Sequence, residues 1–323
     1  MQRKWKVLLV TAVAVFMGFL DVTIVNIAFP DIRASFPDSS LASLSWILNA
    51  YNIVFAALLV PAGRVADRVG RRRMFFLGLW TFLAASVVCG LAPSVEVLVA
   101  ARVVQAAGAA ALVPTSLALL LPEFPLEQRA TATAIWGATG AVAAATGPSL
   151  GGLLVDATGW RLVFFVNLAF GLAALLPARR LLRETRERDP GPLPDAVGVA
   201  LLIGGVGLLS LGIVKGGDWG WGGTRVLAAL AGGLALLALC ARRSAAHPAP
   251  VVELSLFRVR SFAVATAGVA LFALGFYALL LANVLFLTQV WGWSVLTAGF
   301  ALTPGPLTAA VAAPIGGRIS DRF

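Results

Sequence analysis

The chain has 323 residues, of which 59% are hydrophobic and only 12% are charged, and its formal net charge at pH 7 is +10. Because soluble domains carry about 25% charged residues, this composition excludes an ordinary water-soluble fold and favours a protein embedded in a lipid bilayer. The positive charges stand in short clusters between apolar runs, and this placement also excludes a nucleic-acid-binding face.

Ten apolar segments are long enough to cross a membrane as helices, which takes about 20 residues each. The first is too long for a signal peptide, so we expect it to stay in the protein. Lys and Arg are concentrated in every second connection, which predicts a multi-pass protein of the plasma or inner membrane with a cytoplasmic N-terminus. The segments are 7–29, 44–64, 74–92, 96–121, 131–155, 161–182, 195–215, 225–241, 262–288 and 295–316.

Two charged residues, Asp21 and Arg102, lie inside predicted spans. At 1.5 Å per residue they stand about 12 Å and about 9 Å from the outer ends of their segments, so they lie at similar depth and are able to interact. A charge at lipid depth costs about 2.5–3.5 kcal/mol or more and by default indicates function. Burial favours the neutral carboxyl and a guanidinium favours the carboxylate, so we interpret the two residues as a proton- or cation-coupling site. The alternative is a static pair.

The connection between the second and third segments reads Gly-Arg-Val-Ala-Asp-Arg-Val-Gly-Arg-Arg over residues 63–72. We expect Gly63 to allow close helix packing, and Asp67 to pair with arginines or to cap a helix. Residues 317–323, after the tenth segment, share the glycine, the aspartate and the first two arginines. Chance similarity of short loops is the alternative to an internal repeat. A repeat predicts two homologous six-span halves with two extra spans between them.

The second copy of this motif stops at Phe323, where the first copy continues with Gly70. We therefore expect the sequence to be a fragment of a longer protein, with about four spans missing if each half has six. Sequencing the gene past codon 323 tests this expectation.

The fifth segment is rich in small residues and contains Gly-Pro-Ser-Leu-Gly-Gly at 147–152. Small residues allow tight contact between membrane helices, and a proline permits a kink. Ordinary small-residue packing is the alternative to a specific role.

These motifs resemble those of the major facilitator superfamily, closest to its fourteen-span drug:proton antiporter branch, over essentially the whole chain. The resemblance implies an all-α polytopic membrane protein with the major facilitator fold. It implies a six-helix bundle at 1–182, a cytoplasmic linker with two additional transmembrane helices at 183–261, and the first two helices of an incomplete second bundle at 262–323. Its loop motif, a latch between the halves, falls on Gly63, Asp67, Arg68, Gly70 and Arg71. Its antiporter motif falls on Gly147, Pro148, Gly151 and Gly152.

The function that the resemblance implies is proton-coupled export of drugs or other amphiphilic or cationic small molecules by alternating access, with a site between the halves near the midplane. Candidate cavity-lining residues are Asn26, Trp46, Tyr51 and Gln105. We expect a monomer in lipid, driven by the proton gradient, with no cofactor or metal. Catalytic and ATP-binding patterns are absent from the sequence, which argues against a membrane enzyme or a primary pump. A narrow-specificity metabolite exporter and a non-transporting truncated remnant remain alternatives.

Overall fold

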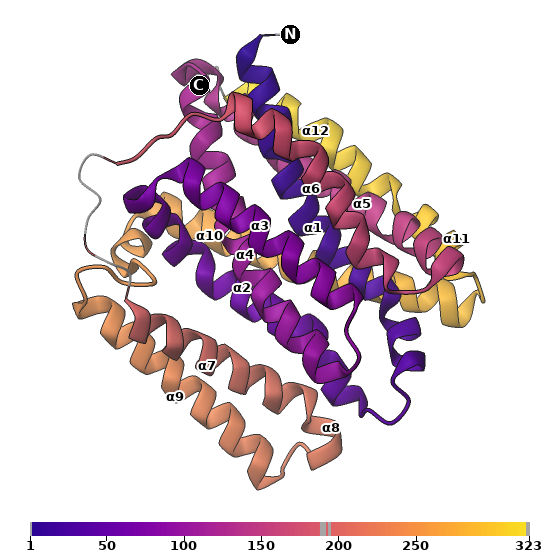
Figure 1. Cartoon of the computed structure of the whole chain (residues 1–323). Coiled ribbons are helices and arrows are strands. Elements are labelled where there is room, and N and C mark those ends of the chain that lie inside the picture. Colours follow the sequence, from indigo (N-terminus) through magenta and orange to yellow (C-terminus); the bar gives the residue numbers. More distant parts are fainter. Residues whose placement is uncertain (1, 188–191, 193–194, 321–323) are drawn as a thin grey trace. The chain divides into compact units, whose positions relative to one another are not determined.

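A computed structural model describes residues 2–187, 192 and 195–320, and helices make up most of this part of the chain (Figure 1). The longer helices are α1 (Arg3–Ser35), α2 (Leu41–Val69), α3 (Arg71–Gly90), α4 (Val95–Leu120), α5 (Arg129–Thr158), α6 (Leu162–Leu181), α7 (Ala196–Val214), α9 (Thr224–Ala246), α10 (Arg260–Leu285) and α12 (Pro304–Ser320). The shorter ones are η1 (Leu121–Glu123), η2 (Leu126–Gln128), α8 (Gly216–Trp219), η3 (Leu254–Arg258), η4 (Phe286–Val290) and α11 (Val295–Leu302).

Within the described residues, eight helices are long and apolar enough to cross a membrane, and they correspond to the first eight predicted segments. Four of them, α1, α2, α5 and α9, extend beyond both predicted ends, because hydropathy marks the apolar stretch and the helix continues into polar surroundings. The first helix is an example: it extends from Arg3 to Ser35, whereas the apolar pattern predicted 7–29.

The last two predicted segments come out differently. The ninth is α10, whose apolar part among the described residues is Arg260–Phe276. The tenth was wrong as a single helix, because a turn at Thr303 separates α11 from α12. Pro304 explains the break, since a residue before proline is disfavoured in the α conformation and proline lacks the N–H of a continuing helix. The second copy of the loop motif ends in residues 321–323, which lie outside the described residues.

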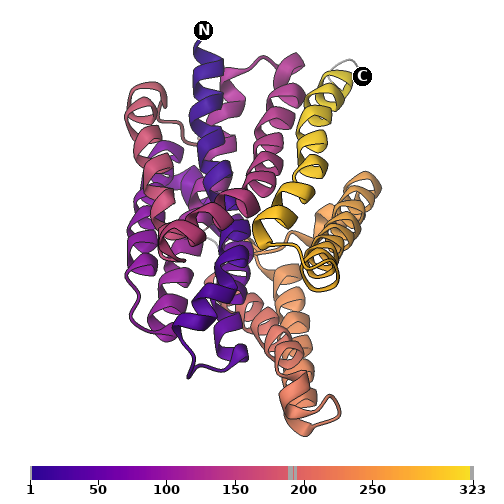
Figure 2. The ribbon, with the colours of Figure 1, turned by 90° about the vertical axis from the view of Figure 1, so that its right-hand side faces the viewer.

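Contacts divide the chain into two compact units, Met1–Gly191 with Thr303–Phe323 and Pro192–Leu302. In the first unit, α1 to α6 pack side by side, and α12 (yellow in Figure 2) runs along α5. In the second unit, α7 and α9 form a hairpin that α8 connects (Figure 1). The first unit thus combines the six helices of the predicted first bundle with α12, which the resemblance assigned to the second bundle.

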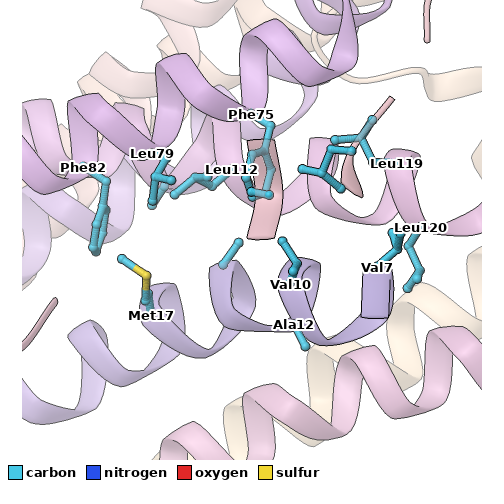
Figure 3. Packing of buried hydrophobic residues seen from close by; sticks show 14 of the residues in the cluster. Val7, Val10, Ala12, Met17, Phe75, Leu79, Phe82, Leu112, Leu119 and Leu120 are labelled. Carbon is cyan, nitrogen blue, oxygen red and sulfur yellow. The ribbon is translucent and has the colours of Figure 1, made fainter. Parts of the chain in front are cut away.

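Small and apolar side chains bring the first unit together. One buried cluster lies between α1, α3 and α4, where Met17 of α1 faces Phe82 of α3 (Figure 3). The helices α3 and α4 approach closely at Gly78, where an added Cβ would lie 2.8 Å from the carbonyl oxygen of Gly108. This close approach fixes α4, and the polar residues on it, against the centre of the bundle.

Candidate functional site

A buried ion pair lies at the centre of the first unit. The Arg102 guanidinium of α4 donates through Nη1 to Oδ2 of Asp21 on α1. The side chain of Asp21 is 0% exposed and that of Arg102 is 1% exposed. The structure thus brings together the two charged residues that the sequence placed at similar depth.

Two neutral amide side chains bond directly to this pair, and a serine supports them. Gln105 Nε2 donates to Asp21 Oδ1 over 2.8 Å, and Arg102 Nη1 donates to Gln105 Oε1 over 2.7 Å. Asn167 Nδ2 of α6 donates to the same Asp21 oxygen over 3.1 Å. Ser86 Oγ of α3 accepts from Gln105 Nε2 over 2.9 Å. Residues 102 and 105 share one face of α4 because they are three apart, so one helix supplies both the cation and the bridging amide.

The remaining surroundings of Arg102 are a carbonyl and aromatic rings. Its Nε donates to the Ile47 carbonyl oxygen of α2 over 3.1 Å. Its guanidinium carbon lies 4.0 Å from the Tyr51 ring centroid and 5.9 Å from that of Phe164. An arginine over an aromatic face gains cation–π attraction, and most strongly where water is excluded. Five helices, α1, α2, α3, α4 and α6, therefore contribute to this one site, which we call the charge centre.

Two polar atoms beside the charge centre have no hydrogen-bond partner among the described residues. They are the Tyr51 hydroxyl and Asn167 Oδ1, and both are buried. An unpaired buried polar group costs about 1–3 kcal/mol. The charge centre therefore holds two buried groups with unused hydrogen-bonding capacity.

Sequence reasoning did not identify Ser86 and Asn167 as members of the charge centre. Asn167 interrupts an otherwise apolar stretch of α6, and a polar amide inside a span is a signal that points to an interhelical partner. Ser86 gives no comparable signal, because serine within a membrane helix commonly bonds its own backbone, as Ser86 Oγ also does with the Phe82 carbonyl at 2.8 Å.

The candidate cavity-lining residues divide into two pairs. Tyr51 and Gln105 are fully buried and belong to the charge centre. Asn26 is exposed, with its amide Nδ2 donating to the Val22 carbonyl over 2.7 Å, and Trp46 is half-buried. Only the second pair is therefore placed where it has direct access to the outside of the bundle.

The glycine motif of the fifth span packs against α1, next to Asp21. An added Cβ at Gly147 would lie 2.7 Å from Thr23 Cβ, and one at Gly151 would lie 2.9 Å from Ile24 Cγ1. Pro148 and Gly152 are buried on the same helix, which continues through the proline from Arg129 to Thr158. The motif thus allows α5 to lie closer to α1 than any larger side chain would permit.

The loop motif forms a tight junction between α2 and α3. Gly70 has a φ of 121°, a region that favours glycine. It is both the C-cap of α2 and the N-cap of α3. Arg71 Nε donates to Asp67 Oδ1 over 2.8 Å, which is the expected aspartate–arginine pairing. Arg68 is exposed.

The explanation predicted for Gly63 does not hold. An added Cβ there would meet only Pro114 Cβ at 3.8 Å, an ordinary van der Waals distance, so close helix approach does not require this glycine in the structure. The tight position in the motif is Gly70 instead, where an added Cβ would lie 2.6 Å from a carboxylate oxygen of Glu184.

That carboxylate belongs to a segment after α6, residues 183–187, which we call the strap. Glu184 Oε1 accepts from the Arg72 backbone N–H over 3.0 Å at the start of α3. The Arg71 N–H donates to the Thr185 carbonyl over 3.0 Å, and the Glu187 N–H donates to the Asp67 carbonyl over 3.1 Å. A negative side chain at a helix N-terminus is favourable, so the loop motif holds the strap through both backbone and charge.

Comparison with known proteins identifies relatives over nearly the whole chain. Residues 11–323 match the family model described as Major Facilitator Superfamily. The chain is 37% identical over 320 residues to the multidrug resistance protein Stp of Mycobacterium tuberculosis, covering 98% of this chain and 59% of that protein. It is 37% identical over 322 residues to the tetracenomycin C resistance and export protein of Streptomyces glaucescens, with 99% and 60% covered.

A more distant relative is the multidrug export protein EmrB of Escherichia coli, 32% identical over 314 residues, with 97% of this chain and 61% of that protein covered. The chain thus spans about three fifths of the length of these relatives. Among solved structures, the inward-facing, unoccupied bacterial homologue of the human lysosomal transporter Spinster matches with a TM-score of 0.53 and 19% identity, covering 99% of this chain and 75% of that one. That likeness concerns the fold alone.

Proposed function

Because the chain belongs to the major facilitator superfamily, we propose that it forms part of a secondary active transporter that exports small molecules in exchange for protons. The charge centre is the observation that carries this proposal. A carboxylate and a guanidinium that are both buried at span depth are costly to maintain. Proton-coupled transport would give this buried pair a function. The names of the relatives, which include multidrug resistance and antibiotic export, support export as the direction.

The burial of Asp21 favours one form of coupling over another. Its two carboxylate oxygens already accept bonds from Arg102, Gln105 and Asn167, so a cationic cargo has no direct access to them in this arrangement. We therefore propose that protonation of Asp21 acts through helix packing. A proton on the carboxyl removes the charge that balances Arg102, and an unbalanced buried guanidinium is strongly unfavourable, which drives α1 and α4 to rearrange.

In the proposed cycle, a proton from outside enters Asp21 when the transporter is open to that side and leaves to the cytoplasm in the other state. Alternating access around a site near the midplane then couples inward proton flow to outward cargo movement. The same proposal includes a monomeric transporter with fourteen spans. It lies in the plasma or inner membrane with its N-terminus in the cytoplasm. Amphiphilic or cationic molecules are the proposed cargo.

The decisive test is efflux driven by an imposed pH gradient in proteoliposomes that contain the purified protein. Asp21→Asn removes the titrating proton and keeps the size of the side chain, so gradient-driven efflux is expected to stop while exchange without a gradient continues. Asp31→Asn is the matched control on the same helix, because an asparagine oxygen is still able to accept the bond that the Trp160 N–H donates over 2.9 Å. Efflux that still responds to the gradient in Asp21→Asn would remove this residue from the coupling mechanism.

A narrow-specificity exporter is the second candidate, and the tetracenomycin C relative favours it as much as the multidrug relatives favour broad export. An efflux panel of dyes, drugs and antibiotics separates the two. Transport of one chemical class alone identifies a dedicated exporter, whereas transport of unrelated amphiphiles identifies a multidrug exporter.

A further inference from the structure

The α7–α9 hairpin of the second unit has a well-defined end, where α7 begins and α9 finishes. Asp195, at the start of α7, is 2% exposed and accepts from Arg243 Nε through both carboxylate oxygens, at 2.9 and 2.7 Å. The Asp195 N–H donates to the Ala249 carbonyl oxygen over 3.2 Å. The two helices and the chain that follows them are therefore held together at this end. We call it the closed end of the hairpin.

A surface groove of about 460 Å³ opens beside the closed end. Val197, Leu201 and Leu239 line its apolar part. Arg242, Arg243, Ala246, His247 and Pro248 line the rest. Because α7 runs away from the closed end and α9 runs toward it, Leu201 and Leu239 lie deeper along the hairpin and the basic residues lie at its end. The groove thus changes from apolar to cationic in the direction in which a lipid changes from acyl chain to headgroup.

The cationic part of the groove contains hydrogen-bond donors that are not used within the described part of the chain. Arg242 is exposed and forms no hydrogen bond or ion pair with the residues that the structure describes. Arg243 uses only its Nε on Asp195, which leaves its two terminal amino groups. His247 accepts the Ala249 N–H at Nδ1 over 3.1 Å, so in its neutral form the hydrogen stands on Nε2. The charge near the groove is therefore positive, with one carboxylate against two guanidinium groups.

We propose that this groove binds an anionic phospholipid, with its phosphate on Arg242, Arg243 and His247 and an acyl chain along Val197, Leu201 and Leu239. Guanidinium groups bind phosphate oxygens in pairs and with charge assistance. Basic pockets between membrane helices on the cytoplasmic side suit anionic headgroups, and the loop charges place the closed end on that side. This site gives the two additional spans a role that is independent of the charge centre.

The test uses the purified full chain in nanodiscs that contain phosphatidylglycerol and phosphatidylcholine in equal amounts. Native mass spectrometry counts the lipids that remain bound after transfer to detergent. We expect preferential retention of phosphatidylglycerol, and about a fivefold loss of that preference in Arg242→Gln, since one arginine near the membrane surface is worth about 1 kcal/mol. Arg225→Gln is the matched control, an exposed arginine at the other end of α9. Circular dichroism verifies that each variant keeps its helix content.

Two further arms identify the ligand class. Leu239→Trp fills the apolar part of the groove and is expected to lower lipid retention, whereas Leu227→Trp, at a similarly exposed leucine of α9, leaves it unchanged. Inorganic phosphate and glycerol phosphate are added separately in detergent, with thermal stability as the measurement. A gain with phosphatidylglycerol that neither soluble anion reproduces supports the lipid assignment.

Three results would overturn the proposal. They are equal retention of the two lipids, equal losses in Arg242→Gln and Arg225→Gln, and stabilisation by inorganic phosphate as large as that by phosphatidylglycerol.

Discussion

The molecule contains two aspartate–arginine pairs whose surroundings differ sharply. At the charge centre, five helices surround Asp21 and Arg102 on every side, and both side chains are almost completely buried. At the closed end of the hairpin, two helices hold Asp195 and Arg243, and the arginine side chain is 37% exposed. The same two residue types thus form an enclosed pair in one place and, in the other, a pair whose arginine is partly exposed, which we call the open pair. The strength of an ion pair depends on this enclosure more than on the distance between its atoms.

The largest effect is expected from leaving one charge of the enclosed pair without its partner. Arg102→Met strands the Asp21 carboxylate in the bundle, and the free energy of unfolding is expected to fall by about 3–5 kcal/mol. Thermal or denaturant unfolding in detergent measures this change. The double variant Asp21→Asn/Arg102→Met should recover most of the loss, because no buried charge remains. A double variant as unstable as the single one would mean that shape, and not charge, holds this site.

The second effect concerns the packing that surrounds the enclosed pair. Gly147→Val is expected to cost about 1–3 kcal/mol, since its side chain would overlap Thr23 on α1. Gly137→Val is the matched control on the same helix, because an added Cβ there meets nothing within 4 Å. Unfolding midpoints of the two variants provide the comparison, and equal values would show that the tight α1–α5 contact contributes little to stability.

A smaller effect is expected at the strap. Glu184→Gln keeps a carbonyl oxygen for the Arg72 N–H but removes the negative charge at the start of α3, and such a charge is worth about 0.3–1 kcal/mol. Cleavage by trypsin at Arg183 and Arg186 is therefore expected to accelerate about two- to fivefold. Glu127→Gln, on an exposed turn, is the control. Cleavage that does not change would show that backbone bonds alone hold the strap.

The smallest effect belongs to the open pair and appears as pH dependence. The hydrogen bond from Arg243 lowers the pKa of Asp195 below its usual 3.8, an effect that the burial of this carboxyl opposes. A lowered native pKa means that the pair stabilises the fold above the unfolded-state pKa and that this contribution disappears as the pH falls through the native value. The difference in melting temperature between wild type and Asp195→Asn should thus be constant near neutral pH and shrink below pH 3.8. A difference that persists under acid conditions would contradict the assigned cause.

The sequence predicted the spans of the first eight helices well, because apolar length is a local property. It also placed Asp21 and Arg102 at compatible depth, since each stands out against lipid-facing neighbours. The full composition of the charge centre was not predictable in this way. Gln105 entered as a cavity residue, and Ser86 resembled any small helix residue, because which face of a helix turns toward a charge depends on how five helices pack.

The strap illustrates the same limit in a loop. The glycine and the arginines of the motif are visible in the sequence, but their partner Glu184 lies 112 positions away from Arg72. Conversely, Gly63 was assigned a packing role that the structure does not support, since its neighbour lies at an ordinary distance. The motif therefore predicted the pairing of Asp67 with an arginine but not the contact with Glu184.

The position of Thr23, two residues after Asp21, has a mechanical consequence. On one side α1 carries the carboxylate of the charge centre, and on another it presses Thr23 and Ile24 into the glycine face of α5 with almost no slack. A small rotation of α1 about its axis would therefore displace α5. Helix α5 in turn contacts α12. Under the proposed coupling, protonation of Asp21 would therefore be transmitted from α1 through this close contact to α5 and α12.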